Sequence, residues 1–274
     1  AIAFVIAMVI RAFAFQAFKI PTGSMQPTLY GITVDPQIGK QWSDYVPVNL
    51  VKMALWGVQY QELHASVDGP LGARWMADDE FNTYFVGGVP QKCRRGLTLH
   101  VTPGSLVAKG QLLASGLVNF GDHIFVNKVK YNFLRPRRGD IIVFDTDRIN
   151  YDRIRPNSFY IKRLVGLPGD EITVDPPYLV ANGNKITEPY PFERLLKEKD
   201  KGYIGYRYAD AAAQSILNHP GAVIHVGLDE FLPFGDNTAF SLDGRYFGPV
   251  KQASLVGPAF MIYWPFTKRW GFVQ

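Results

Sequence analysis

The sequence predicts a mostly β chain, and two observations predict it. The 274 residues include 26 glycines and 19 prolines, and turn-forming residues separate many short β-branched and aromatic runs. Beyond residue 30, apolar residues do not recur at the spacing of an amphipathic helix. We therefore expect an antiparallel β body with strands at 121–128, 140–145, 159–165, 171–174 and 259–264.

Local signals add one hairpin and two short helices to this body. Asn182 and Gly183 lie between two short runs and form the pair that favours a two-residue hairpin turn, so we expect a hairpin over 180–186. The stretch 42–63 has room for a short helix. In the charged stretch 190–214, residues 193–199 have the charge spacing of a surface helix.

The first 18 residues are apolar except for Arg11 and Gln16. They are fewer than the ~20 apolar residues that cross a bilayer, so we interpret them as the C-terminal end of a membrane-anchor helix. Arg11 would then extend toward the lipid headgroups. A cleavable signal peptide and an amphipathic surface helix are the alternatives. Because the chain begins at Ala1 rather than at methionine, we expect that further residues precede it.

Charge and side-chain chemistry exclude several classes of function. The net charge is +5, but the basic residues are dispersed, which favours anionic lipid over nucleic acid as a partner. A single cysteine, Cys93, cannot form an internal disulfide. The five histidines show no metal-ligand spacing, and we expect no metal and no cofactor. The aromatic run 261–272 suits either a core strand or a membrane interface.

A serine segment directly follows the apolar N-terminus. Ser24 lies between Gly23 and Met25, and prolines at 21 and 27 flank it. Proline restricts its own backbone and that of the preceding residue, whereas glycine permits close approach of another chain. We expect a rigid extended segment that presents the Ser24 hydroxyl near a membrane surface, as a nucleophile. An ordinary proline-rich exit from an anchor helix is the alternative.

A second segment, 160–172, places Lys162 in an apolar run that ends in a Pro-Gly-Asp turn. An inward-facing lysine loses its hydration, which lowers its pKa and makes a neutral amine available. Such an amine can remove the proton from a serine hydroxyl. Lys162 and Arg163 alternate along the strand, so we expect one to be buried while the other stays exposed.

The third segment, 234–248, is rich in turn residues and carries Ser241, Asp243 and Arg245. In an extended chain these three side chains share one face. A carboxylate beside a guanidinium forms a charge-assisted pair that can make a loop rigid. The alternative is a surface loop with an incidental ion pair.

In this order, the three segments resemble the bacterial type I signal peptidases, which are membrane-anchored serine–lysine endopeptidases that remove signal peptides. The resemblance extends from the anchor end to Leu29, from 121 to about 174 and from 232 to about 250, and includes strand-like stretches at 121–128 and 138–144. It implies that Ser24 is the nucleophile and Lys162 the general base. Thr22 would supply the side-chain donor of the oxyanion hole, together with the Ser24 N–H.

The resemblance also implies supporting roles. Ser241 would hydrogen-bond and orient the lysine amine, and Asp243 and Arg245 would form a supporting pair. Ile20 and Ile161 would line shallow pockets for small substrate side chains. The partners implied are signal peptides of exported preproteins and membrane lipid. The implied location is the bacterial inner membrane, with the catalytic domain on the periplasmic side.

The resemblance divides the chain into an anchor end at 1–18, a signal-peptidase-like catalytic β domain at 19–30 and 119–274, and an inserted accessory module at 31–118. Within the insertion, residues 100–116 resemble part of a small β-sandwich of the biotinyl or lipoyl type. No lysine stands in a Met-Lys-Met tip there, so a swinging-arm attachment site is not indicated.

Three other hypotheses about the function compete with a signal peptidase. A self-cleaving regulatory protease uses the same serine–lysine chemistry but needs a DNA-binding or cleavable N-terminal segment. A periplasmic membrane-fusion adaptor, or another non-enzymatic β-rich binding protein, is suggested by 100–116, but such adaptors need long coiled-coil heptads and none are visible. A catalytically inactive relative is disfavoured because Ser24 and Lys162 are both present.

Overall fold

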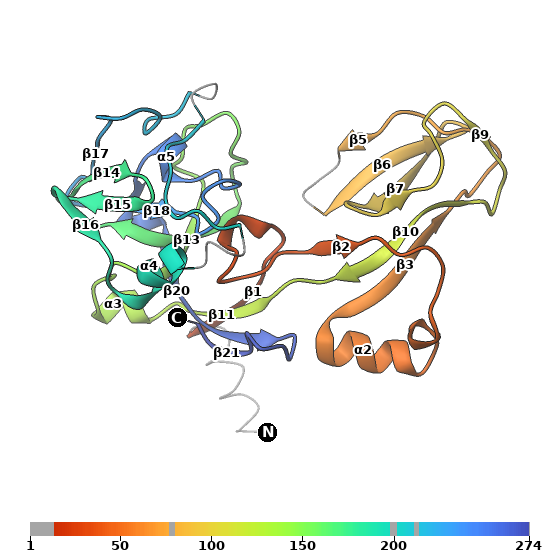
Figure 1. Cartoon of the computed structure of the whole chain (residues 1–274), viewed down its shortest axis with the longest axis horizontal. Helices are drawn as coiled ribbons and strands as arrows, with labels where there is room; N and C mark the ends of the chain where they lie inside the picture. The colour runs from red at the N-terminus through yellow and green to blue at the C-terminus, as the bar shows by residue number, and fades with distance from the viewer. Residues whose placement is uncertain (1–13, 77–79, 198–201, 211–213, 274) are drawn as a thin grey trace.

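The computed structural model describes residues 14–76, 80–197, 202–210 and 214–273. It has two lobes (Figure 1): one contains β1 and the elements from β11 onward, and the other contains α2 and the strands from β3 to β10. Strand β2 (Thr33–Asp35) and the end of β10 (Leu112–Asn119) lie between the lobes and pair with each other. The predicted mostly β, antiparallel architecture is confirmed.

The larger lobe is built on an eight-stranded sheet. Its order is β1-β11-β20-β12-β13-β18-β19, and β21 pairs with β20. The bounds are β1 (Phe15–Lys19), β11 (His123–Asn127), β12 (Ile141–Asp145), β13 (Phe159–Gly166), β18 (Glu230–Phe234), β19 (Val250–Lys251), β20 (Leu255–Trp264) and β21 (Gly271–Phe272). A second sheet, in the order β16-β15-β14-β17, contains β14 (Glu171–Asp175), β15 (Tyr178–Ala181), β16 (Asn184–Ile186) and β17 (Ile224–His225). The five strands expected from the sequence are confirmed as β11, β12, β13, β14 and β20.

The expected hairpin is confirmed between β15 and β16. Asn182 and Gly183 both have positive φ, 51° and 77°, which is the backbone geometry that a two-residue turn of this kind needs. Short helical elements also lie in this lobe: α3 (Lys130–Phe133), α4 (Tyr190–Lys197), α5 (Gly244–Phe247) and the 3-10 turns η1 (Gly23–Met25) and η4 (Gln252–Ser254).

Helix α4 confirms the helix expected at 193–199 as far as Lys197, since 198–201 lie outside the described residues. The charges of this segment predicted a surface helix, but one of its faces is buried. Phe192 and Leu195 are buried in the core formed with the second sheet, because they fall on one face of the helix.

The smaller lobe has small sheets and a core of its own. Its strands are β3 (Val58–His64), β4 (Gly69–Pro70), β5 (Trp75–Met76), β6 (Phe81–Val86), β7 (Val89–Arg94), β8 (Thr98–Leu99) and β9 (Leu106–Val107), together with β10. The short helix expected within 42–63 is α2 (Val48–Trp56), which follows the 3-10 turn η2 (Trp42–Asp44). Cys93 lies in the core of this lobe, where burial raises the pKa of its thiol to about 11.

The expectation of an anchor helix reaching residue 18 is wrong for residues 15–18. They belong to β1, which pairs with β11 along its whole length, from Phe15 opposite Asn127 to Lys19 opposite His123. Sheet pairing satisfies the backbone groups of this segment and competes with any helix there. Residues 1–13 lie outside the described residues. In the part of the chain that the structure describes, no helix has both the length and the apolar character needed to cross a bilayer.

Asp122 fixes the place where the two lobes meet. Its carboxylate is fully buried and accepts two hydrogen bonds from Arg269, at 3.0 and 2.8 Å, and one from the Tyr30 N–H at 2.7 Å. The Arg269 guanidinium also lies 4.1 Å from the centre of the Tyr30 ring. One carboxylate thus ties the chain after the serine segment, the β10–β11 connection and the C-terminal hairpin together.

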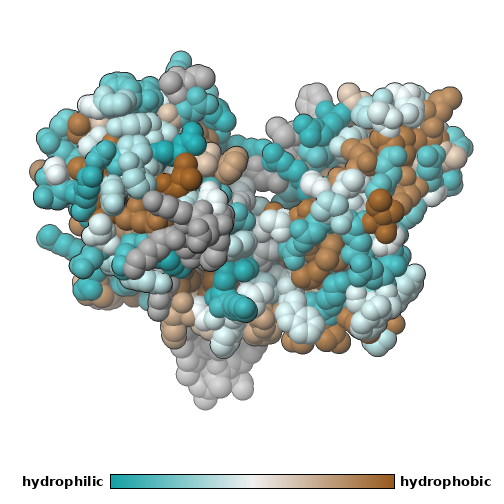
Figure 2. All heavy atoms as spheres, in the orientation of Figure 1, coloured by the Kyte–Doolittle hydropathy of each residue, from teal (hydrophilic) through white to brown (hydrophobic). Residues whose placement is uncertain are grey.

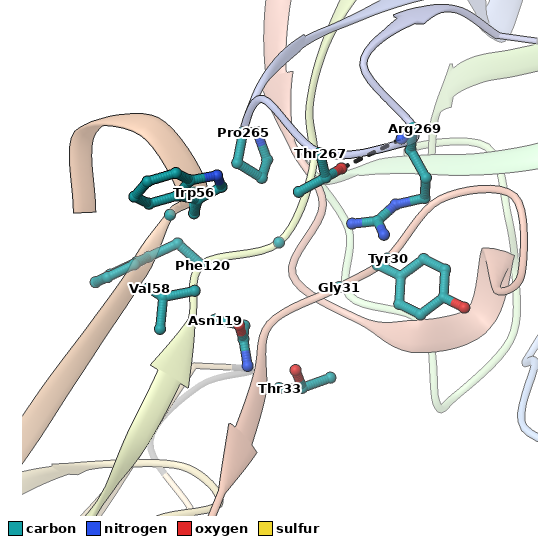
Figure 3. A pocket seen from close by; sticks show the side chains of 12 residues that line it. Tyr30, Gly31, Thr33, Trp56, Val58, Asn119, Phe120, Pro265, Thr267 and Arg269 are labelled. Carbon is teal, nitrogen blue, oxygen red and sulfur yellow. Dashed lines mark hydrogen bonds between the residues drawn. The ribbon is translucent and has the colours of Figure 1, made fainter. Parts of the chain in front are cut away.

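A pocket of about 240 Å³ lies at the same junction (Figure 3). It is lined by Tyr30, Gly31, Thr33, Trp56, Gly57, Val58, Asn119, Phe120, Gly121, Pro265, Thr267 and Arg269. No site residue predicted from the sequence lines it.

We predict that Asp122→Ala lowers the free energy of unfolding by about 2 kcal/mol, because it leaves the Tyr30 N–H and the Arg269 guanidinium without their shared acceptor. Urea unfolding of the full chain measures this. The control is Asp229→Ala, which removes an exposed pair with Lys251 and should leave stability nearly unchanged. Equal effects of the two substitutions would show that Asp122 does not hold the junction.

Candidate active site

The serine segment leaves β1 and closes into a turn at Ser24. Thr22 is still extended, but Gly23–Met25 form the 3-10 turn η1, which the Gln26 N–H closes onto the Gly23 carbonyl at 3.1 Å. The expected extended conformation is therefore wrong at Ser24 itself. The physical reason is burial: a turn places Met25 in the core, where it and Leu29 pack beside strands β11 and β12.

Ser24 and Lys162 meet in the interior. The Lys162 ammonium nitrogen, Nζ, donates to Ser24 Oγ at 2.7 Å, and the two residues are 4% and 9% exposed. The pKa of Lys162 is lowered to about 8, mainly by burial; Arg245 also lowers it, whereas Asp243 and Asp236 partly offset the shift. A neutral amine is therefore accessible near physiological pH, and it could accept the proton of the hydroxyl that it contacts.

Arg163 lies on β13 next to Lys162, and the expectation that one of the two stays exposed is wrong. Arg163 is fully buried because the C-terminal half of β13 is covered on both faces. Its guanidinium makes two hydrogen bonds of 2.7 Å to Asp236 and one of 2.6 Å to the Gly139 carbonyl. Such a buried pair is geometrically demanding, so it fixes β13 relative to the loop after β18.

Asp243 and Arg245 form a second buried pair, with contacts of 2.8 and 2.9 Å between their charged groups. The expectation that they lie in an extended chain is wrong, because Asp243 caps helix α5 and accepts from the Arg245 N–H. Asp243 also accepts from the Gly235 N–H at 2.9 Å, and Arg245 donates to the Ser241 carbonyl at 3.3 Å. The pair therefore holds both ends of the 235–241 loop and is not an incidental surface contact.

This loop lies directly against the serine segment. The Asn237 N–H donates to the Ser24 carbonyl at 3.0 Å, and the Asn237 side chain donates to the Gly23 carbonyl at 3.1 Å. A Cβ at Gly235 would lie 2.6 Å from the Ser24 carbonyl oxygen and 2.1 Å from Ser241 Oγ. Only glycine at 235 allows this approach.

Ser241 does not make the expected hydrogen bond to the lysine amine. Its hydroxyl is buried, and in the described part of the chain it has no hydrogen-bond partner. The Lys162 amine is directed to Ser24 instead. The structure brings Ser241 to the site through Gly235 but leaves its orienting role a prediction.

The remaining predicted residues flank the serine. Thr22 is exposed, two residues before Ser24. Ile20 is 2% exposed and lies in the core, whereas Ile161 is half-buried and packs against the same core. Of these two, Ile161 has the side chain that is more accessible to a substrate in this structure.

Sequence reasoning missed a polar cluster beside the site. Thr28 donates to Asp236, and Arg194 from helix α4 donates to Thr28, so the helix is tied to the serine segment. Arg194 gave no signal, because its distance from Thr28 in the chain is 166 residues. Among the described residues, no group of acidic, histidine or cysteine side chains could hold a metal ion.

Comparison with known proteins identifies the family of the chain. The family model described as signal peptidase, peptidase S26, matches residues 114–264, more than half of the chain. The chain belongs to this family. It is 34% identical over 152 residues to signal peptidase I of Bacillus caldolyticus, covering 54% of this chain and 72% of that one.

Two further proteins show comparable identity to the chain. Signal peptidase IB of Staphylococcus aureus strain COL is 31% identical over 168 residues, covering 61% of this chain and 80% of the relative. The crystal structure of a signal peptidase I from Enterococcus faecalis is 30% identical, covers 46% of this chain and 97% of that one, and superposes with a TM-score of 0.33.

We predict that Lys162→Met stabilises the chain at pH 7. The pKa of Lys162 is about 8 when folded and near its ordinary 10.5 when unfolded, so burial of the charged amine opposes folding below pH 8. Between pH 8 and 10.5 the folded state has lost this proton and the unfolded state still binds it, so the free energy of unfolding rises with pH in this range. The substitution should therefore raise the free energy of unfolding on the order of 1–3 kcal/mol at pH 7, and less above pH 10.

Urea unfolding at both pH values, in a Ser24→Ala background, measures this effect. Lys109→Met is the control, because Lys109 is exposed and far from the site. A loss of stability in Lys162→Met at pH 7 would mean that the amine is a net stabilising group rather than a desolvated one.

Proposed function

We propose that this chain is a membrane-anchored serine endopeptidase that removes signal peptides from exported preproteins, with Ser24 as nucleophile and Lys162 as general base. The observation that carries the proposal is the 2.7 Å contact between Ser24 Oγ and a buried lysine whose pKa is lowered to about 8. Membership in the signal peptidase family supports the reaction class and the substrate.

In the proposed mechanism, the neutral Lys162 amine accepts the proton of Ser24 as the hydroxyl oxygen attacks the scissile carbonyl carbon. The resulting ammonium donates that proton to the leaving amine as the peptide bond breaks. A water molecule then attacks the acyl-enzyme ester and gives a proton to Lys162. Lys162 returns that proton to Ser24 Oγ as the ester bond breaks, which releases the acid product and regenerates the serine hydroxyl. With the pKa of Lys162 near 8, its neutral fraction acts as the base, and the proposal involves no second base.

The oxyanion that forms at the carbonyl needs donors near Ser24. The Ser24 N–H lies in the first turn of η1, where no acceptor within the helix is available, and this supports its role as one donor. Thr22 is exposed two residues earlier, and its hydroxyl is the second donor in this proposal. We assign these two groups to the oxyanion hole.

The two buried ion pairs act as positioning groups. Arg163–Asp236 fixes the strand that carries Lys162, and Asp243–Arg245 fixes the loop that contacts the Ser24 carbonyl. Ser241 enters the proposal as an orienting group for the amine, since it is buried at the site and its hydroxyl has capacity to accept a hydrogen bond.

For substrate recognition we assign Ile161 and Ile20 to shallow apolar pockets. Ile161 is half-buried and packs against the core that contains Ile20. From this assignment we expect a preference for small side chains one and three positions before the cut. The apolar sequence of residues 1–13 supports attachment to the bacterial inner membrane, with the active site on its outer side.

We predict that Ser24→Ala and Lys162→Ala each abolish cleavage of a preprotein and that the double variant is little worse, because the two residues act as one unit. Lys162→Arg should fail as well, since a guanidinium does not deprotonate in proteins. Cleavage by the unaltered chain should rise with pH through about 8, as the fraction of neutral Lys162 grows. Mass spectrometry of the products measures this, with Lys109→Arg as the control. Cleavage by Lys162→Arg would require a different base.

We predict that Thr22→Ala lowers kcat about 10²–10³-fold with little change in KM, because the hydroxyl contributes mainly in the transition state. Thr22→Ser keeps the hydroxyl and should retain most of the activity. Steady-state kinetics on a peptide that spans the cleavage site separate the two constants. If the alanine and serine variants are equally active, Thr22 is not part of the oxyanion hole.

A further inference from the structure

Helix α2 in the smaller lobe has its polarity reversed relative to a helix that packs on a water-soluble protein. Its two polar residues, Asn49 and Lys52, are the two that are half-buried. Its apolar residues are all exposed, including Leu50 at 56%, Val51 at 49% and Trp56 at 49%. A surface helix in water normally buries its apolar stripe and exposes its polar one.

Specific contacts hold the helix in this orientation. Lys52 turns inward and binds the buried Asp44 carboxylate at 2.5 Å, with a further contact to Ser43 at 3.5 Å. At the other end, Trp264 donates from its indole nitrogen to the Ala54 carbonyl at 2.7 Å, and the Phe266 N–H donates to the Leu55 carbonyl at 2.8 Å. These contacts at both ends of the helix keep its apolar face turned toward the solvent.

The exposed apolar face of α2 lies next to the β20–β21 hairpin of the larger lobe. The last turn of α2 is hydrogen-bonded to that hairpin. The hairpin exposes Phe266 at 49%, Trp270 at 50% and Phe272 at 79%, with exposed Lys268 among them. Figure 1 places α2 and β21 along the same lower edge of the molecule, and in Figure 2 apolar atoms at that edge alternate with hydrophilic ones. Exposed apolar side chains gathered on a helix and on the hairpin bonded to it are more than the scattered exposed residues expected of a water-soluble surface.

We propose that this surface, α2 together with the β20–β21 hairpin, rests on a lipid bilayer, so that the smaller lobe provides a second, interfacial contact with the membrane. Three features favour lipid over a protein partner. Tryptophan and tyrosine, the residues of membrane interfaces, flank the helix as Trp42, Tyr45 and Trp56, with Trp42 79% exposed. Exposed Lys268 matches anionic headgroups.

The third feature is the position of β1, where the described part of the chain begins. The apolar sequence of residues 1–13 joins the described structure at the start of β1, where the Phe15 ring lies 5.3 Å from that of Phe260 on β20. The same strand continues into the exposed hairpin. The sheet that begins with β1, directly after the apolar sequence, thus also carries the exposed hairpin, and a bilayer can accommodate both an apolar sequence and an apolar surface.

This contact would constrain how the protein is oriented on the membrane. A helix lying in the interface and a hairpin bonded to it would fix the orientation of both lobes relative to the membrane. The inference stands on exposure and contacts at α2 and does not depend on peptidase activity.

Site-directed spin labelling of the full chain tests the proposal, in a Ser24→Ala background so that proteolysis plays no part. A nitroxide is attached at Leu50→Cys on α2, and in separate samples at Trp270→Cys on the hairpin and at Leu106→Cys. Leu106, at 81% exposed, lies on β9 in the same lobe and away from α2 in Figure 1, and is the matched control. Native Cys93 is only 3% exposed and should not react.

On vesicles of phosphatidylcholine and phosphatidylglycerol, the labels at 50 and 270 should become several-fold more accessible to oxygen than to a water-soluble nickel chelate, while the label at 106 stays accessible to nickel. Nickel accessibility at 50 equal to that at 106, in protein that sediments with the vesicles, would overturn the proposal. Protection of position 50 that appears without vesicles and grows with protein concentration would also overturn it, because a second copy of the chain would then cover the helix.

Discussion

The burial of one lysine against one serine is the constraint on which the rest of the larger lobe depends. A charged amine in an apolar interior is unfavourable unless it is paired, and here it is paired with a neutral hydroxyl. The fold therefore lowers the pKa of Lys162 instead of neutralising it with a carboxylate. Burying the amine without a carboxylate partner reduces stability and yields the neutral amine that the proposed chemistry needs.

The surrounding architecture keeps that arrangement from relaxing. Carboxylates are close by, but each is already bound by an arginine: Asp236 by Arg163 and Asp243 by Arg245. Both pairs are fully buried and bidentate, so neither acid is available to Lys162 as a direct partner. The two pairs thus supply rigidity to the strand and the loop, while the amine keeps its hydrogen bond to Ser24.

The sequence was sufficient for the parts of this account that depend on local chemistry. Short β-branched runs predicted the central strands, Asn182-Gly183 predicted its hairpin, and three motifs predicted the residues that meet at the site. It was insufficient where tertiary packing decides. Residues 15–18 are apolar enough for a helix but find a partner strand in β11, Ser24 turns because Met25 is buried, and Arg163 is buried because both faces of β13 are covered. Arg194 reaches the site from helix α4 through a contact that no local pattern encodes.

The most direct test of the central claim is the pKa of Lys162 itself. NMR titration of the lysine side-chain signals in Ser24→Ala protein, with Lys162→Arg to assign the resonance, follows this one amine through its protonation. The account predicts a pKa near 8, well below the ordinary value of 10.5. A value at or above 10.5 would contradict it, because the amine would then be fully charged at neutral pH and could not act as the base.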